Sequence, residues 1–144
     1  MLIRFFAPGL PKGQPRPRAF ARRMGSKVVA RVFDAGTAEG WKSAVVAAGE
    51  PYRPAHPVEV PVRVSLRFAM PRPKSMHTRA KAAMTEVPHT GKPDADNLAK
   101  AVLDAMTLAG WWRDDSQVYV LTVQKYVGNV GERTGCHVVV EAQA

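Results

Sequence analysis

The stretch Val58-Glu-Val-Pro-Val-Arg-Val-Ser-Leu-Arg-Phe-Ala-Met70 carries the clearest strand pattern in the chain. Every second residue is apolar, and the residues between them are charged, polar or small. Because successive side chains of a strand point to opposite faces of a sheet, this alternation predicts one face on a core and one toward solvent or an interface. Pro61 cannot donate to a neighbouring strand, which favours an edge position at that end.

A helix is expected downstream over 97–109, where Leu98, Val102, Ala105 and Ala109 recur at helical spacing. Asp96 or Asn97 is expected to cap this helix, and Gly110 to end it. Two further strands follow over 118–127 and 136–141. The glycines between them resemble those of a hairpin.

Upstream, a short buried strand over 2–6 leads into a loop rich in proline and glycine. Arg18–Arg23 and Lys27–Phe33 read as the two strands of a hairpin. Thr37 can then cap a helix that runs to about Ala48. Together these elements predict one α/β domain over 1–144, with the order strands, helix, strand, helix, strands.

Residues 71–91 show no periodicity and contain several basic side chains. A loop of this length inside a small domain is usually functional or disordered. We expect a flexible basic arm that becomes ordered on nucleic acid.

The charge of the chain indicates a polyanionic partner. Its 144 residues carry a formal net charge of +9. Residues 1–81 hold 16 basic and 4 acidic side chains, whereas residues 82–144 hold 5 basic and 8 acidic ones. The single Cys136 excludes an internal disulfide and fits a reducing compartment. No apolar run is long enough for a membrane span, so a soluble cytoplasmic protein is expected.

Five acids fall within 94–115, and a metal ion would explain why they cluster. Asp94 and Asp96 can point at one ion, and Lys100 follows one helical turn after Asp96. Carboxylates beside a lysine suit metal-assisted phosphodiester hydrolysis. The alternative is that these acids only cap helices and turns, and an Asp-x-Asp pair alone is a weak signal.

Two longer segments carry a more specific pattern. They are Lys92-Pro-Asp-Ala-Asp-Asn-Leu-Ala-Lys100 with Leu103-Asp-Ala-Met106, and Gly110-Trp-Trp-Arg-Asp-Asp-Ser-Gln-Val118. Together they resemble the signature of the RusA family of Holliday junction resolvases. The basic, proline-rich segment Pro11–Arg18 is a looser match to the same family.

The resemblance implies a RusA-like fold, with a mixed β-sheet and two main helices packed on it. It also implies a homodimeric bacterial or phage crossover junction endodeoxyribonuclease that acts in recombination and repair. Magnesium, with manganese possible in its place, would be the cofactor, and branched four-way DNA the partner. In this reading Asp94, Asp96 and Asp115 bind the metal, and Lys100 completes the catalytic set.

Basic residues of the first part of the chain and of the arm are expected to hold the DNA. They are Lys12, Arg16, Arg18, Arg72, Lys74, Arg79, Lys81 and Lys92. Trp111 and Trp112 could insert into an opened junction, although one of two adjacent tryptophans usually packs in a core. The alternatives for function are an inactive DNA-binding module of the same fold and a less selective branched-DNA nuclease.

Overall fold

The computed structural model describes residues 1–15, 18–24, 27–33, 38–75 and 86–143, and for 18–24 and 27–33 it gives the backbone. In chain order the elements are β1 (Leu2–Pro8), β2 (Arg18–Met24), β3 (Lys27–Phe33), α1 (Glu39–Gly49), the 3₁₀ turn η1 (Glu50–Tyr52), β4 (Val62–Met70), β5 (Val87–Pro88), α2 (Ala95–Ala109), the 3₁₀ turn η3 (Asp115–Gln117), β6 (Val118–Val127) and β7 (Gly135–Ala142).

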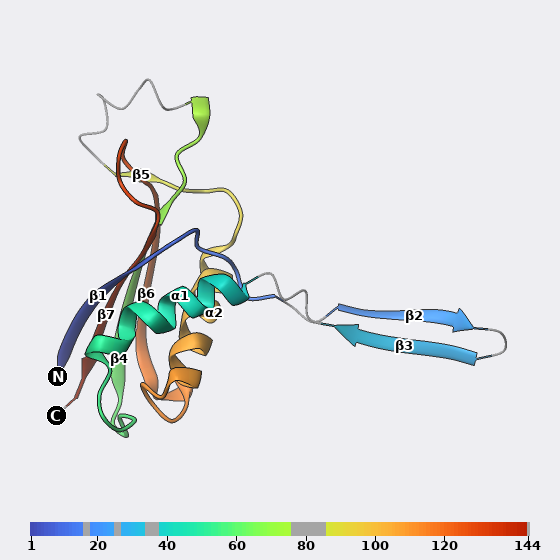
Figure 1. Ribbon diagram of the computed structural model, residues 1–144, viewed down its shortest axis with the longest axis horizontal. Helices are drawn as coiled ribbons and strands as arrows, with labels where there is room; N and C mark the ends of the chain where they lie inside the picture. Colours follow the sequence, from blue (N-terminus) through green and yellow to red (C-terminus); the bar gives the residue numbers. More distant parts are fainter. Residues whose placement is uncertain (16–17, 25–26, 34–37, 76–85, 144) are drawn as a thin grey trace.

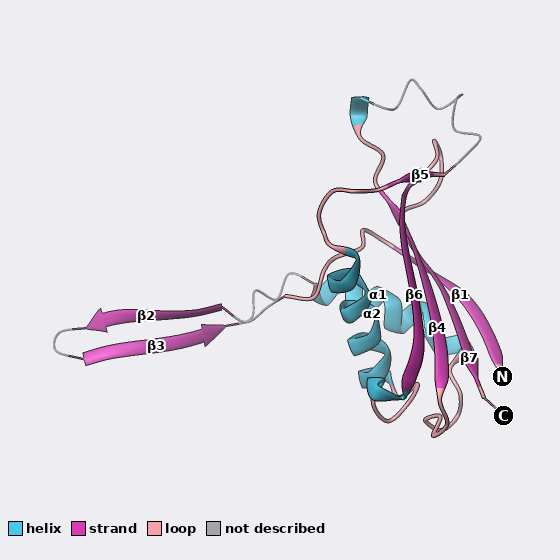
Figure 2. Ribbon diagram, turned by 180° about the vertical axis from the view of Figure 1, so that it is seen from behind, coloured by secondary structure: helices cyan, strands magenta, loops and turns pink. Residues whose placement is uncertain are grey.

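Five strands form one mixed sheet in the order β1-β7-β4-β6-β5. β4 and β6 run parallel, and the other neighbouring pairs are antiparallel. Both α1 and α2 pack on one face of this sheet, while β1 and β7 bring the two ends of the chain together (Figures 1 and 2). The predicted α/β class, with two helices on a mixed sheet, is confirmed.

The alternating stretch forms the middle of the sheet rather than an edge. β4 begins at Val62, directly after Pro61, so its predicted start at Val58 and its edge position are wrong. Proline marks the boundary because it cannot join the ladder. Before it, the chain pairs elsewhere: Val58 N–H donates to the Trp111 carbonyl at 2.9 Å.

β6 and β7 are not a hairpin, because β4 lies between them. Val64 of β4 pairs with Leu121 of β6 on one side and with Val140 of β7 on the other. The seven-residue connection over 128–134 is long enough to cross one strand, since two strand spacings amount to about 10 Å. The turn residues in the sequence therefore indicated a connection between β6 and β7, but they did not indicate that this connection crosses β4.

Both helices start at other residues than predicted. α1 has Ala38 as its N-cap, without a side-chain cap, and the expected cap Thr37 lies outside the described residues. α2 has the extended residue Asp94 as its N-cap, so Asp96 and Asn97 belong to its first turn. Acidic residues are favourable there because they face the positive end of the helix dipole. Gly110 ends α2 as predicted, with a left-handed φ of 88°.

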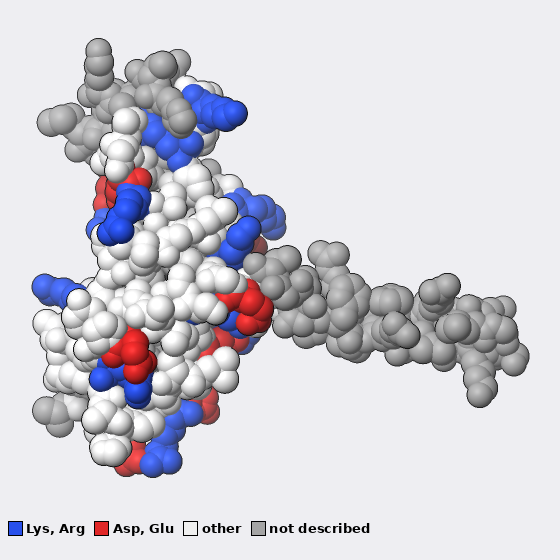
Figure 3. Space-filling view, viewed as in Figure 1, with Lys and Arg blue, Asp and Glu red and all other residues white. Residues whose placement is uncertain are grey.

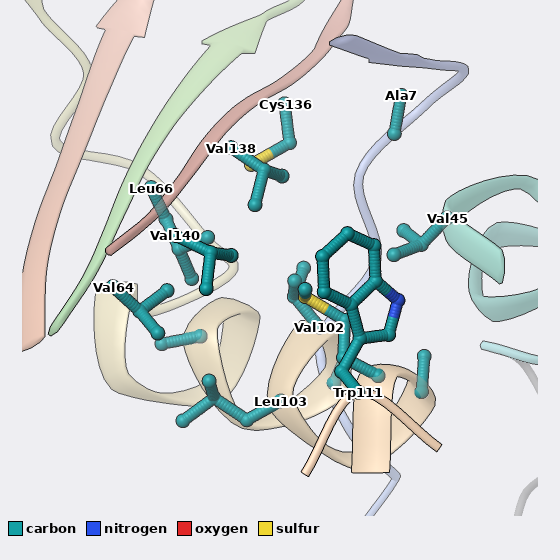
Figure 4. Close-up of a cluster of buried hydrophobic side chains, with 14 of the residues drawn as sticks. Ala7, Val45, Val64, Leu66, Val102, Leu103, Trp111, Cys136, Val138 and Val140 are labelled. Carbon is teal, nitrogen blue, oxygen red and sulfur yellow. The ribbon is translucent and has the colours of Figure 1, made fainter. Parts of the chain in front are cut away.

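The core lies between the helices and one face of the sheet (Figure 4). Trp111 packs among Val45 of α1, Val102 of α2 and the sheet, and its ring stacks on Phe5 with centroids 5.5 Å apart. Trp112 is equally buried, and its indole N–H donates to Thr107 Oγ1 at 2.7 Å. Both tryptophans are thus core residues in this structure, which contradicts their insertion into DNA. Cys136 is a buried packing residue, and its burial raises the pKa of the thiol.

The predicted hairpin is present as β2 and β3, paired from Arg18 with Phe33 to Met24 with Lys27. It projects away from the sheet and the helices (Figure 1). Of the predicted arm over 71–91, the segment 76–85 lies outside the described residues. Part of the remainder is regular, because β5 pairs with the end of β6. Across the described ranges, no helix is long and apolar enough to cross a membrane.

Candidate functional site

One face of α2 carries three of the polar residues of the acidic segment. Asp96, Lys100 and Asp104 follow one another at intervals of four, so they lie on the same side of the helix. Lys100 Nζ lies 3.9 Å from Asp104 Oδ1, in a pair that remains partly open to solvent. Such a pair adds little stability. It does hold an ammonium group beside a carboxylate.

The turn after α2 is fixed by hydrogen bonds around Asp114. This residue caps η3, where its Oδ1 accepts from Ser116 N–H at 3.5 Å. The Gln117 side chain accepts from Asp114 N–H at 3.1 Å and donates to the carbonyls of Val58 and Val60, at 2.8 and 3.1 Å. The turn is therefore tied to the segment before β4, which positions Asp115 at the start of η3.

Asp104, Asp114 and Asp115 line one hollow of about 390 Å³, together with Lys42, Thr107 and Leu108. We call it the Asp115 hollow. Burial raises the pKa of Asp115, and so do its hydrogen bond to Asp114 and the charges of Asp114 and Asp104, while Lys100 opposes the shift. The pKa of Asp114 is lowered, chiefly by its hydrogen bonds to Ser116. Carboxylates that disfavour one another's charge are a donor set that a cation would relieve.

A second hollow, of about 470 Å³, lies at the beginning of α2 and is lined by Lys92, Pro93, Asp94 and Asn97. We call it the Asp94 hollow. Lys92 Nζ lies 3.5 Å from Asp94 Oδ1, with both groups largely exposed. This hollow contains the first acid of the predicted set.

Two contacts position the segment that leads into Asp94. Lys125 of β6 donates through its Nζ to the carbonyls of Gly91 and Pro93, each at 2.7 Å. The N-terminal loop also reaches this place, because Gln14 N–H donates to the Asn97 carbonyl at 3.1 Å. A Cβ added at Gly13 would lie 2.5 Å from Asn97 Nδ2, so the loop approaches α2 closely at this residue and the Asn97 side chain would have to shift to make room. Lys12 is thereby brought near the beginning of α2.

The structure thus distributes the predicted catalytic residues along α2 instead of gathering them. Asp94 lies in one hollow and Asp115 in the other, while Asp96 and Lys100 stand on the helix that connects them. No three His, Cys, Asp or Glu side chains of the described ranges are close enough together to hold a metal ion. Asp96 precedes the helix predicted over 97–109 but lies in the first turn of α2, whereas Asp94 is the extended N-cap.

The sequence did not indicate two lysines that belong to the site. Lys42 of α1 lines the Asp115 hollow, and no motif marked it. Lys125 had a weak signal, since it is the only charged residue of β6.

The predicted DNA-contacting residues are found in several places. Lys12 and Lys92 lie near the beginning of α2, whereas Arg72 donates to the Gly128 carbonyl at 3.4 Å, beyond the end of β6. Lys74 follows Arg72 in the chain, and Arg18 belongs to β2. Arg16, Arg79 and Lys81 lie outside the described residues. The face in Figure 3 shows basic and acidic side chains interspersed, without one continuous basic surface among the coloured atoms.

Comparison with known proteins agrees with this combination of sheet, helix and acidic segment. The family model of the endodeoxyribonuclease RusA matches residues 8–140, which is nearly the whole chain. The chain therefore belongs to the RusA family of endodeoxyribonucleases. It is also similar to the uncharacterized protein YqaN of Bacillus subtilis strain 168, with 34% identity over 128 residues that cover 86% of this chain and 87% of the relative.

Proposed function

We propose that this protein is a magnesium-dependent endonuclease that resolves four-way DNA junctions by hydrolysing phosphodiester bonds, in recombination and repair. Membership of the RusA family supports the endonuclease class. The observation that carries the finer proposal is the polar face of α2, on which Lys100 stands between Asp96 and Asp104. Asp94 directly precedes this helix, and Asp115 lines the same hollow as Asp104. A phosphate backbone laid along this face would meet carboxylates at both ends and an ammonium group between them.

The proposed magnesium ligands are Asp94, Asp96 and Asp115. Mg²⁺ keeps several waters and is usually bound through one or two carboxylates together with substrate phosphates. The two separate hollows are compatible with this mode of magnesium binding, because an ion held partly by water and substrate phosphate does not need three carboxylates in one hollow. The donor set also fits a hard cation, since every proposed ligand is a carboxylate and like charges surround Asp115. When bound, the ion would polarise the scissile phosphate and supply an activated water.

Lys100 is proposed to stabilise negative charge that develops on the phosphate during cleavage. Its contact with Asp104 keeps the ammonium on the polar face of α2. Lys12 and Lys92 are proposed to contact neighbouring phosphates, because both lie near the Asp94 hollow. We also propose a homodimer, because symmetric resolution requires two strands to be cut.

Asparagine variants at the acids test the proposed chemistry. Asp94→Asn and Asp115→Asn keep the shape of each side chain and remove one negative charge. We expect both to bind a synthetic four-way junction like the wild type but to lose at least 100-fold in magnesium-dependent cleavage, as expected when a group that acts mainly on the transition state is removed. Glu141→Gln, a matched change at an exposed acid of β7, should cleave normally. Normal cleavage by Asp94→Asn would disprove the assignment.

The same assay separates the two alternatives. An inactive DNA-binding module would bind the junction but not cut it at any magnesium concentration. A less selective nuclease would cut flap and duplex substrates as readily as the junction. If phosphate contacts dominate binding, the logarithm of the affinity falls steeply with the logarithm of the salt concentration, and Lys12→Ala with Lys92→Ala should make the slope shallower. A flat dependence in the wild type would exclude a basic DNA surface.

A further inference from the structure

The face of the sheet that points away from the helices is uncovered within the described part of the chain. Both helices lie on the other side of the sheet (Figure 2). We call the uncovered side the open face. Burial along β4 shows which residues it carries, because Leu66 and Phe68 are fully buried while Arg67 between them is partly exposed. The sheet therefore separates the open face from α2 and its acids.

A row of side chains crosses the open face from β1 to β6. Phe6 of β1 lies opposite His137 of β7, with ring centroids 4.7 Å apart, and both residues are half-buried. His137 lies opposite Arg67 of β4, and Arg67 lies opposite Gln124 of β6. Residues opposite one another in neighbouring strands share a face. Three strand spacings of about 4.8 Å make this row about 14 Å long.

Arginine side chains lie over aromatic rings near both ends of the row. The guanidinium carbon of Arg133 lies 5.1 Å from the centre of the Phe6 ring. That of Arg67 lies 4.9 Å from the centre of the Tyr126 ring. A guanidinium stacked on a ring still presents its outer plane and its N–H donors. We call Phe6, His137, Arg67 and Gln124, with Arg133 over Phe6, the cross-strand row.

The two ends of the cross-strand row differ in charge. At the β6 end, Arg67 pairs with Glu86 and donates to Gln124 Oε1 at 3.0 Å, so its charge is balanced and its plane is held in place. At the β1 end, Arg133 forms no ion pair with any acid of the described ranges. The row thus joins a flat, neutral part to a cation that is available to an anion.

A hollow of about 310 Å³ lies at the β1 end of the row, lined by Phe6, Glu132, Arg133 and His137. Its one acid has partners of its own, because Glu132 accepts from the Tyr126 hydroxyl and, at 3.0 Å, from Asn129 N–H. These bonds hold the carboxylate away from the guanidinium beside it. The hollow therefore combines two rings with a cation that no acid neutralises.

We propose that the open face binds an unpaired nucleic-acid strand, with bases stacked on Phe6 and His137 and a phosphate held by Arg133. Proteins that bind single strands combine aromatic side chains, on which bases stack, with cations that contact the backbone. At about 3.4 Å per nucleotide, about four stacked nucleotides have the length of the row. This second binding surface goes beyond the proposed junction cleavage, which is placed at α2 on the other side of the sheet.

The chemistry of the cross-strand row favours this ligand over two others. A duplex keeps its bases stacked on one another, so it offers phosphates to Arg133 but no base face to Phe6. An acidic peptide can pair with Arg133 but has no flat group to cover Phe6 and His137. Only an unpaired strand brings both phosphates and exposed base faces.

Binding of fluorescein-labelled dodecathymidylate to the full chain tests the proposal, measured by fluorescence anisotropy with EDTA present so that no metal-dependent cleavage occurs. Phe6→Leu keeps an apolar side chain but removes the ring, and it should weaken binding roughly 5- to 100-fold, the range for loss of one stacked base. Tyr52→Leu is the matched control, because it removes a 53% exposed ring from η1. This control should bind like the wild type.

The dependence of binding on salt tests the role of Arg133. Each phosphate contact on a single strand adds about 0.7 to the slope of the logarithm of affinity against the logarithm of salt concentration. Arg133→Gln should therefore make this slope shallower by about 0.7. Arg53→Gln, which removes an arginine that pairs with Glu50, is the matched control and should leave the slope unchanged.

Backbone amide chemical shifts give a readout that needs no substitution. When dodecathymidylate is added to the wild type, the amides of Phe6, Arg133 and His137 should shift more than those of α2. A urea titration shows whether Phe6→Leu is folded. If that variant is unfolded, the shift map of the wild type decides the question by itself.

Each outcome decides the inference. Wild-type binding by folded Phe6→Leu, or shifts confined to α2 and its two hollows, would overturn it. Displacement of the strand by polyglutamate as effectively as by unlabelled dodecathymidylate would also overturn it, because the surface would then recognise charge alone.

Junction cleavage by the wild type in magnesium, measured separately, keeps the proposed function distinct. Strand binding on the open face without any cleavage leaves this inference and refutes the nuclease. Cleavage by a protein whose open face binds no strand refutes this inference and leaves the nuclease.

Discussion

Lys125 is expected to position the Asp94 hollow, although its ammonium group bonds to backbone carbonyls rather than to an acid. It contacts the carbonyls of Gly91 and Pro93, on either side of Lys92 and directly before Asp94. A hydrogen bond from a charged donor contributes about 1.5–3 kcal/mol when shielded. One of these two is exposed, so we expect about 1–2 kcal/mol for the pair.

Replacing Lys125 with methionine removes both bonds and keeps most of the apolar stem. If the bonds hold Asp94 in place for a metal ion, the magnesium concentration for half-maximal junction cleavage should rise roughly 10- to 100-fold, the usual effect of losing a group that orients a ligand. Lys125→Arg keeps the positive charge and the hydrogen-bond donors, so its half-maximal magnesium concentration should stay close to that of the wild type. Cleavage rates over a magnesium titration give this value directly.

The direction of the change separates positioning from simple electrostatics. Removing a positive charge near a cation site should by itself tighten magnesium binding. A lower magnesium requirement in Lys125→Met would therefore refute the positioning role, and so would an unchanged one. Arg4→Met, which removes one positive charge from the opposite edge of the sheet, serves as the matched control and should leave the titration unchanged.

Two further predictions concern groups beside the site. Thr107→Val leaves the buried Trp112 indole N–H without its acceptor and should lower the free energy of unfolding, measured in urea, by about 1–3 kcal/mol. Thr107→Ser keeps the hydroxyl acceptor and should retain most of the wild-type stability. The pKa of His89 is lowered by burial and by the charge of Lys125, so on acidification the unfolded chain takes up this proton first. Stability should therefore fall as pH drops below about 6.5, and His89→Gln should flatten that fall; an equal decline in both proteins would contradict the assignment.

Periodicity predicted the elements of this fold well where one face of an element is buried. Leu98 and Val102 are fully buried, as their spacing on α2 required. It failed for Val58 and Val60, which continue the alternation of β4 but lie outside it. Their carbonyls instead accept hydrogen bonds from the Gln117 side chain, a residue more than fifty positions away. Sequence spacing carries no information about such a partner.

The arrangement of the strands was less predictable than the strands themselves. Leu121 and Val140 both pair with Val64, so neighbours in the sequence are separated in the sheet. The position of β4 between β6 and β7 depends on which faces of these three strands pack together, and no local pattern of β6 or β7 contains that information. The candidate site shows the same limit. Spacing placed Lys100 beside acids on one helix face, but only the fold brought Lys42 to the hollow that Asp115 lines.

The position of β7 has a consequence for how this domain is made. β7 comes last among the strands in the sequence, yet it lies between β1 and β4. Leu2 pairs with Glu141, so β1 can be completed only after β7, far downstream in the chain, has been synthesised. Such distant pairings form slowly, and a nascent chain emerges N-terminus first. Until Val138 and Val140 leave the ribosome, the core beneath α2 lacks one of its walls, and a partly made chain has no firm support for its acidic helix.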